Sequence, residues 1–118
     1  MKNILAVGTG GTAGALLRAS VYAAAPEAVI LLFVNLTGSF LLGFLSVRFT
    51  GRRSKSVMLF ITTGLLGSFT TFSAFSAQWL HLLEDSLPLG LLYGISMTGG
   101  AVLAALAGLK TGKGRGRE

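Results

Sequence analysis

The chain has 118 residues, of which 52% are hydrophobic and only 12% are charged, and its mean hydropathy is +0.72. A soluble domain carries about 25% charged residues, so this chain is too poor in charge to cover a water-facing surface. It is also too hydrophobic to be a disordered chain. The absence of cysteine excludes disulfides and thiolate chemistry, and a single histidine disfavours a histidine-built metal site. The class that remains is an integral membrane protein.

Long uncharged stretches predict four membrane-spanning helices. Residues 28–47, 56–83 and 86–109 carry no Asp, Glu, Lys or Arg, and each stretch reaches the ~20 residues that cross a hydrocarbon core. The first stretch is interrupted by Arg18, which we expect to lie near one end of its helix or to face an aqueous cavity. The sequence therefore predicts an all-α membrane domain over 1–118, with helices at about 4–24, 28–48, 57–83 and 87–109 and a basic cytoplasmic tail at 110–118.

Basic residues gather on one side of this topology. With four spans, both termini and the loop at 48–56 share a side, and that side carries all the Lys and Arg residues except Arg18. The positive-inside rule predicts that this side, with both termini, is cytoplasmic. The basic tail is similar to an RNA-binding run. We favour a topology anchor that touches anionic lipid, and we expect no nucleic-acid partner.

Two other N-terminal patterns have alternative interpretations. Lys2, an apolar stretch and 23–25 imitate a secretory signal peptide, but Arg18 and Pro26 argue against cleavage. The glycines of 8–14 are superficially similar to a dinucleotide-binding fingerprint, which requires a βαβ unit. We interpret them as a helix-packing face, and the same small-residue spacing recurs on the other helices. The pairs are Gly10 and Gly14, Ser39 and Gly43, Gly90 and Gly94, and Ala104 and Gly108.

The predicted spans lack the groups that energy coupling or covalent catalysis would use. No Asp, Glu or Lys lies inside the second, third or fourth span, whereas a proton-coupled multidrug exporter normally carries a buried carboxylate. His81 has acids at helical spacing only in the adjoining loop, so no nucleophile–base pair is present. We therefore expect neither an exporter of that kind nor an enzyme.

Two polar segments exceed what helix packing requires. Asn35 lies in the middle of the second span, where its amide needs a partner or water; it is either interhelical glue or a donor suited to an anion. Residues 67–76 of the third span concentrate glycine, hydroxyls and β-branched side chains. Such a segment predicts a helix interruption whose backbone carbonyls can hold a cation. Phe72 and Phe75 share a face, either as packing or as ring edges that meet an anion.

Three motifs together resemble the Fluc (CrcB) family of fluoride channels. They are Gly10-Gly11-x-x-Gly14-Ala15-x-x-Arg18, Asn35-x-x-Gly38-Ser39-Phe40-x-x-Gly43, and Gly64-x-x-Gly67-x-x-Thr70-Thr71-Phe72-Ser73-x-Phe75. The resemblance covers all four helices in order. The Thr-Thr-Phe-Ser-x-Phe segment is its most specific part, and the glycine motif of the first helix alone would be weak.

The resemblance implies a passive, fluoride-selective channel that exports fluoride from a prokaryotic cytoplasm across the plasma membrane and so limits its toxicity. It also implies an antiparallel dimer with two pores and a structural sodium ion at the dimer interface. Carried over by position, the pore or fluoride path would contain Asn35, Phe72, Phe75, Thr71, Ser73, Tyr93 and, near its mouth, Arg18. The backbone carbonyls of Gly67 and Thr70 would hold the sodium ion.

Two departures from the family pattern stand out. Four residues after Tyr93 the family usually has a serine, but this chain has Met97; we expect the neighbouring Ser96 and Thr98 to point to other helix faces. The strong charge bias also commits the chain to one orientation, whereas an antiparallel homodimer needs both. We therefore hypothesise that the partner is a related, oppositely oriented subunit. Two rival interpretations remain beside the channel. The first is the multidrug exporter discussed above, and the second is a structural membrane subunit that uses its glycine faces only for assembly.

Overall fold

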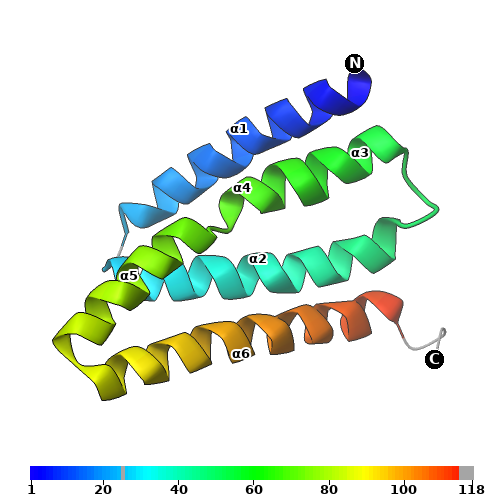
Figure 1. Cartoon of the computed structure of the whole chain (residues 1–118). Helices are drawn as coiled ribbons and strands as arrows, with labels where there is room; N and C mark the ends of the chain where they lie inside the picture. Colours follow the sequence, from blue (N-terminus) through cyan, green and yellow to red (C-terminus); the bar gives the residue numbers. More distant parts are fainter. Residues whose placement is uncertain (25, 115–118) are drawn as a thin grey trace.

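The computed structural model describes residues 1–24 and 26–114, which form helices joined by short turns, without a strand (Figure 1). Four helical units in this part of the chain are long and apolar enough to span a membrane. They are α1 (Lys2–Tyr22), α2 (Glu27–Phe49), a composite unit over Lys55–Asp85, and α6 (Leu87–Lys113). The predicted all-α class with four spans is therefore confirmed. Arg115 and Arg117 of the predicted basic tail lie outside the described residues.

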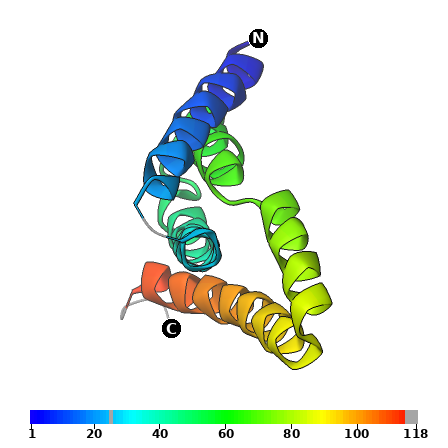
Figure 2. The same ribbon diagram turned by 90° about the vertical axis from the view of Figure 1, so that its left-hand side faces the viewer.

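The third unit consists of four helical pieces. It runs through α3 (Lys55–Leu59), the π-helix η1 (Phe60–Leu66), α4 (Gly67–Phe69) and α5 (Phe72–Asp85). Between α4 and α5, Thr70 (φ −78°, ψ 157°) and Thr71 (φ −148°, ψ 121°) have extended dihedral angles. Figure 2 shows α5 leaving the line of α3 and α4 at this point and running toward the start of α6.

α1 packs against the third unit at glycines, where the two backbones approach each other closely. Gly10 and Gly14 are buried on α1, and a Cβ atom at either position would run into the carbonyl oxygen of Phe60 or Leu65 respectively. From the other side, a Cβ atom on Gly64 would lie 2.7 Å from the carbonyl oxygen of Val7. The predicted packing face at Gly10 and Gly14 is therefore confirmed. Since lipid tails are as apolar as leucine, such van der Waals contact drives helix association in membranes.

Glycines also allow close packing of α2 against α6, and these two helices lie side by side along most of their length (Figure 1). Buried Gly43 faces the backbone of Ala105, and buried Gly108 faces the carbonyl of Phe40. At the opposite end of α6, Gly94 packs on the indole of Trp79, whose Nε1–H donates to the carbonyl oxygen of Gly90 at 2.9 Å. The glycines that the sequence pattern singled out thus lie at helix–helix contacts.

The start of α1, the end of α6 and the turn between α2 and α3 lie at one end of the molecule (Figure 1). Among the described residues, seven basic side chains belong to this end, and Arg48 and Arg53 lie over the rings of Phe44 and Phe49. The seven are Lys2, Arg48, Arg52, Arg53, Lys55, Lys110 and Lys113. The opposite end carries Glu27, Glu84 and Asp85 in or beside its two turns. The fold therefore produces the charge asymmetry expected from the sequence.

The interior of this chain is small for its hydrophobicity. Within the described residues the buried hydrophobic side chains are Ile30, Leu31, Val34, Leu66, Phe75 and Met97. Large apolar side chains are exposed along all the long helices, Phe33, Phe72 and Leu103 among them. Such surface is expected where lipid or a second subunit, and not water, covers the helices.

The packing at Gly14 can be tested against a matched glycine on the same helix. We expect Gly14→Ala to destabilise the folded protein by about 1–3 kcal/mol, because the added methyl group overlaps the Leu65 carbonyl. Gly8→Ala is the control, since nothing lies within 4 Å of a Cβ atom there, and alanine improves helix propensity. Unfolding in detergent measures both; equal stability of the two variants would contradict the packing.

Candidate functional site

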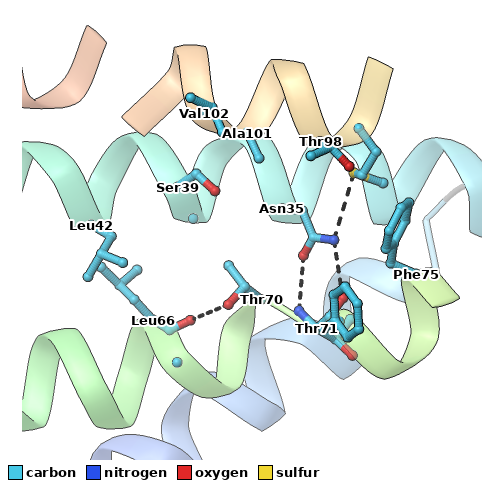
Figure 3. A pocket seen from close by; sticks show the side chains of 14 residues that line it. Asn35, Ser39, Leu42, Leu66, Thr70, Thr71, Phe75, Thr98, Ala101 and Val102 are labelled. Atoms are coloured by element: carbon cyan, nitrogen blue, oxygen red, sulfur yellow. Dashed lines mark hydrogen bonds between the residues drawn. The ribbon is translucent and has the colours of Figure 1, made fainter. Parts of the chain in front are cut away.

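A cavity of about 350 Å³ lies where α2, the segment between α4 and α5, and α6 meet (Figure 3). Its lining contains no Asp, Glu, Lys or Arg. It combines apolar side chains with one amide and several hydroxyls. The lining residues are Asn35, Gly38, Ser39, Leu42, Leu66, Gly67, Thr70, Thr71, Phe72, Phe75, Met97, Thr98, Ala101 and Val102.

The Asn35 amide pairs with the backbone of Thr71. Its Oδ1 accepts from the Thr71 N–H at 3.0 Å, and its Nδ2 donates to the Thr71 carbonyl oxygen at 3.2 Å (Figure 3). The side chain thus satisfies a residue whose extended dihedral angles take it out of the helical ladder. A backbone polar group without a partner is costly in an apolar medium, so the pairing stabilises the non-helical segment against α2.

The second N–H of the same amide donates to the thioether of Met97, with an Nδ2–Sδ distance of 3.8 Å. Met97 is only 3% exposed, and it packs in one cluster with Leu31 and Phe75. An asparagine amide has two donors. One therefore belongs to Thr71 and the other to Met97.

The hydroxyls around the non-helical segment are used locally. Thr70 Oγ1 donates back to the Leu66 carbonyl at 3.0 Å. Thr71 Oγ1 caps α5 by accepting from the Ala74 N–H at 3.3 Å, and it also lies 3.3 Å from Ser73 Oγ. Hydroxyls and an amide around an apolar cavity are neutral hydrogen-bond donors. Such donors suit a small anion, and they bind it less tightly than a buried cationic side chain would.

Aromatic rings form one wall of the site. Phe75, which is buried, stacks on Trp79 and Tyr93 with ring centroids 5.6 and 5.9 Å away. Phe72 lies 5.9 Å from Phe75 in a tilted arrangement, yet 77% of Phe72 is exposed. The two rings are neighbours, as their spacing predicted. Phe75 belongs to the interior, whereas Phe72 stands at the open side of the cavity.

The structure brings most of the sequence-predicted site residues together. Those that line the cavity are Asn35, Gly67, Thr70, Thr71, Phe72 and Phe75. Ser73 and Tyr93 are not among the lining residues, but they contact the lining residues Thr71 and Phe75 respectively. Tyr93 also directs its hydroxyl to the Ala28 carbonyl, 3.5 Å away. Arg18 is half-buried on α1, one helical turn before Tyr22, and does not line the cavity.

Thr98 lines the cavity together with Met97, and Figure 3 shows Thr98 in its wall. Met97 is buried whereas Thr98 is exposed, so the two residues lie on neighbouring faces of α6 and the cavity reaches both. Ser39 and Gly38 on α2 belong to the lining as well, and their position one turn after Asn35 was the signal for them.

Two backbone carbonyls beside the cavity are without their helical donors. In a continuous helix the carbonyl of Gly67 would accept from the Thr71 N–H, and that of Thr70 from the Ala74 N–H. The first of these N–H groups donates to Asn35 and the second to the Thr71 hydroxyl. The described residues contain no cluster of His, Cys, Asp and Glu that could bind a metal ion. Any cation here would depend on carbonyl oxygens, which suit hard cations.

Sequence comparisons match a family model and several relatives over most of the chain. A family model described as "CrcB-like protein, Camphor Resistance (CrcB)" matches residues 5–109. A "Fluoride-specific ion channel FluC" of Rhizobium meliloti (strain 1021) is 42% identical, over 92% of this chain and 94% of the relative. Another of that name, from Thermotoga maritima, is 37% identical over 94% of each chain. "Fluoride-specific ion channel FluC 2" of Geobacillus kaustophilus is 38% identical over 88% of each.

The pairing of Asn35 with Thr71 predicts a specific loss of stability. Asn35→Ala leaves the N–H and the carbonyl of Thr71 without partners, and we expect it to cost about 1–3 kcal/mol. Ser39→Ala, on the same helix and the same cavity wall, is the control and should stay within about 0.5 kcal/mol of the unmodified protein. Chemical unfolding in detergent compares them, and an unaffected Asn35→Ala variant would show that the pairing contributes nothing.

Proposed function

Since the chain belongs to the CrcB-like family, we propose that it is a subunit of a passive fluoride channel. The names of its FluC relatives and the uncharged cavity support this function. A channel needs no covalent chemistry, so the chain is a transport protein and not an enzyme. The observation that carries the proposal is the placement of Asn35 opposite Thr71, which brings an amide, hydroxyls and Phe rings around one cavity.

The proposed pore chemistry follows from the size and hydration of fluoride. A small, strongly hydrated anion enters a pore when compact donors replace its water, and it leaves when each site is weak. The Asn35 amide, the hydroxyls of Thr71 and Ser73 and the ring edges of Phe72 and Phe75 are such donors. Tyr93 continues this track behind Phe75. Arg18 would act at the mouth, by attracting the anion through its charge.

Passive conduction is sufficient for export. Hydrogen fluoride crosses the lipid as a neutral acid and dissociates where the pH is higher. A cytoplasm less acidic than its surroundings therefore accumulates the anion, and a selective path lets it flow out and limits its toxicity. The uncharged cavity agrees with this passive role, since proton coupling would need a titratable group there. The proposed location is the plasma membrane of a prokaryote, with the basic end in the cytoplasm.

A structural sodium ion fits the carbonyls beside the cavity. Gly67 and Thr70 have lost their helical donors to Asn35 and to the Thr71 hydroxyl, and carbonyls from a broken membrane helix are suitable ligands for sodium. We propose that these two carbonyls hold the ion at the dimer interface. The charge of the ion would stabilise the non-helical segment, since those carbonyl dipoles would otherwise face an apolar medium.

The cavity of one chain is completed by a second, antiparallel subunit in this proposal. Phe72 is 77% exposed at its open side, and apolar side chains continue around it. The charge asymmetry between the two ends of the molecule favours a single orientation. We therefore propose that the partner is a related chain with the opposite orientation, and that lipid covers the remaining apolar surface.

Fluoride efflux from liposomes tests the function. The chain, alone or co-expressed with an oppositely oriented paralogue, should release fluoride rapidly and retain chloride, as ion-selective electrodes would record. Phe72→Ala should reduce the rate by about tenfold or more, because a ring in the path is lost. Leu103→Ala, at a similarly exposed position on α6 outside the cavity, is the control. Replacement of sodium by N-methyl-D-glucamine should slow the fluoride efflux. A purely structural subunit would show no fluoride efflux in either preparation.

Orientation can be measured because the natural chain has no cysteine. Single cysteines would replace Thr111 at the basic end and Ala24 at the other end, both at exposed positions. In intact cells an impermeant maleimide should label Ala24→Cys, and should label Thr111→Cys only after permeabilisation. Comparable labelling of both variants in intact cells would show dual insertion and contradict the paralogue hypothesis.

A further inference from the structure

The hydrogen-bonding capacity of Asn35 is already used within the chain. Its Oδ1 accepts from Thr71, and its two N–H groups are directed to the Thr71 carbonyl at 3.2 Å and to the Met97 sulfur at 3.8 Å. Figure 3 shows the amide between the Thr71 backbone on one side and α6 on the other. An anion in the cavity therefore finds no free amide donor unless one of these bonds opens.

The two bonds of the Nδ2 atom differ in strength. The bond to Thr71 is one of a reciprocal pair, and its loss would leave a backbone carbonyl without a partner. The bond to Met97 ends on a thioether, which is a weak acceptor, and the Met97 sulfur has no backbone hydrogen bond to lose. An incoming anion would therefore displace the thioether first.

We propose that Met97 covers the fluoride-binding amide of Asn35, so that its movement limits the rate at which fluoride passes through this subunit. The inference rests on the proposed function and assigns Met97 a regulatory place in that path. The thioether has lone pairs and no donor, so it repels an anion at the position where it attracts the amide. A serine or threonine there would do the opposite, since its hydroxyl donates to the anion.

The surroundings of Met97 permit this movement. Its unbranched side chain adopts several conformations at small cost. Met97 itself lines the cavity, together with Ala101 one turn further along α6. Its contacts with Phe75 and Leu31 are apolar. Closing is therefore favoured by burial of the methionine, and opening requires the loss of part of this apolar contact and the exchange of one weak hydrogen bond for one to the ion.

Methyl NMR detects the movement directly. The chain has three methionines, so protein labelled with ¹³C at the methionine methyl groups gives few resonances. With sodium fluoride the Met97 methyl resonance should shift or broaden and saturate, whereas sodium chloride should leave it unchanged. Met58, which lies in α3 and does not line the cavity, is the internal control. An unmoved Met97 resonance at fluoride concentrations that support efflux would overturn the proposal.

Flux measurements separate the hydrogen bond from the volume of the side chain. In the preparation that conducts, Met97→Ser should raise fluoride efflux by roughly two- to tenfold, the range expected for one net hydrogen bond. Met97→Leu keeps the volume but removes the acceptor, and it should give a smaller increase. Met58→Leu should leave the rate unchanged. Chloride should remain excluded by every variant.

Each contrary outcome has a defined meaning. Met97→Ser that conducts at or below the unmodified rate, or Met97→Leu that equals the unmodified protein, would overturn the role of the thioether. Passage of chloride through Met97→Ser would show that Met97 only fills space, and would overturn it too. Absence of fluoride efflux from all variants in both preparations would instead reject the proposed function, and the inference with it.

Discussion

The pair of hydrogen bonds between the Asn35 side chain and the Thr71 backbone is the interaction on which the site depends. Extended dihedral angles at Thr70 and Thr71 remove two residues from the helical ladder of the third unit, and a membrane provides no water to replace the lost bonds. The amide on α2 supplies both a donor and an acceptor at this point. At this point α5 turns toward α6 (Figure 2), and the carbonyls of Gly67 and Thr70 are without their helical donors, which bond to Asn35 and to the Thr71 hydroxyl.

That interaction is possible only because the helices approach one another closely. Gly43 and Gly108 bring the backbones of α2 and α6 together, and Gly38 on α2 leaves room for the side chain of Thr70. A larger residue at Gly38 would overlap the Thr70 methyl group and push the non-helical segment away from Asn35. Small residues therefore set the distance at which a short amide side chain can reach a neighbouring backbone, and packing and polar pairing stabilise the same arrangement.

The sequence predicted the parts of this arrangement that are local. Hydropathy gave the four helical units because length and charge alone decide membrane spans, and the spacing of Gly10 and Gly14 identified a contact face. The partners of Asn35 were not predictable, since Thr71 and Met97 lie 36 and 62 residues away in the chain. The π-helical turns of η1 were also missed. They change the register of the third unit, and helical period then no longer tells which side chains of α3 and α4 share a face.

Asn35 reconciles two requirements that are usually in conflict within a membrane. A buried hydrogen-bond donor without a partner costs free energy as long as no ion is bound. A donor that has a strong permanent partner, in contrast, is not available to the ion. In this chain the amide has one strong partner in Thr71, which fixes its position, and one weak partner in Met97, which can be exchanged. The weak bond satisfies the amide in the absence of an ion and costs little to replace. In the proposed fluoride path such an amide would bind its ion loosely, which conduction requires, and the residue at position 97 would determine how readily the amide becomes available.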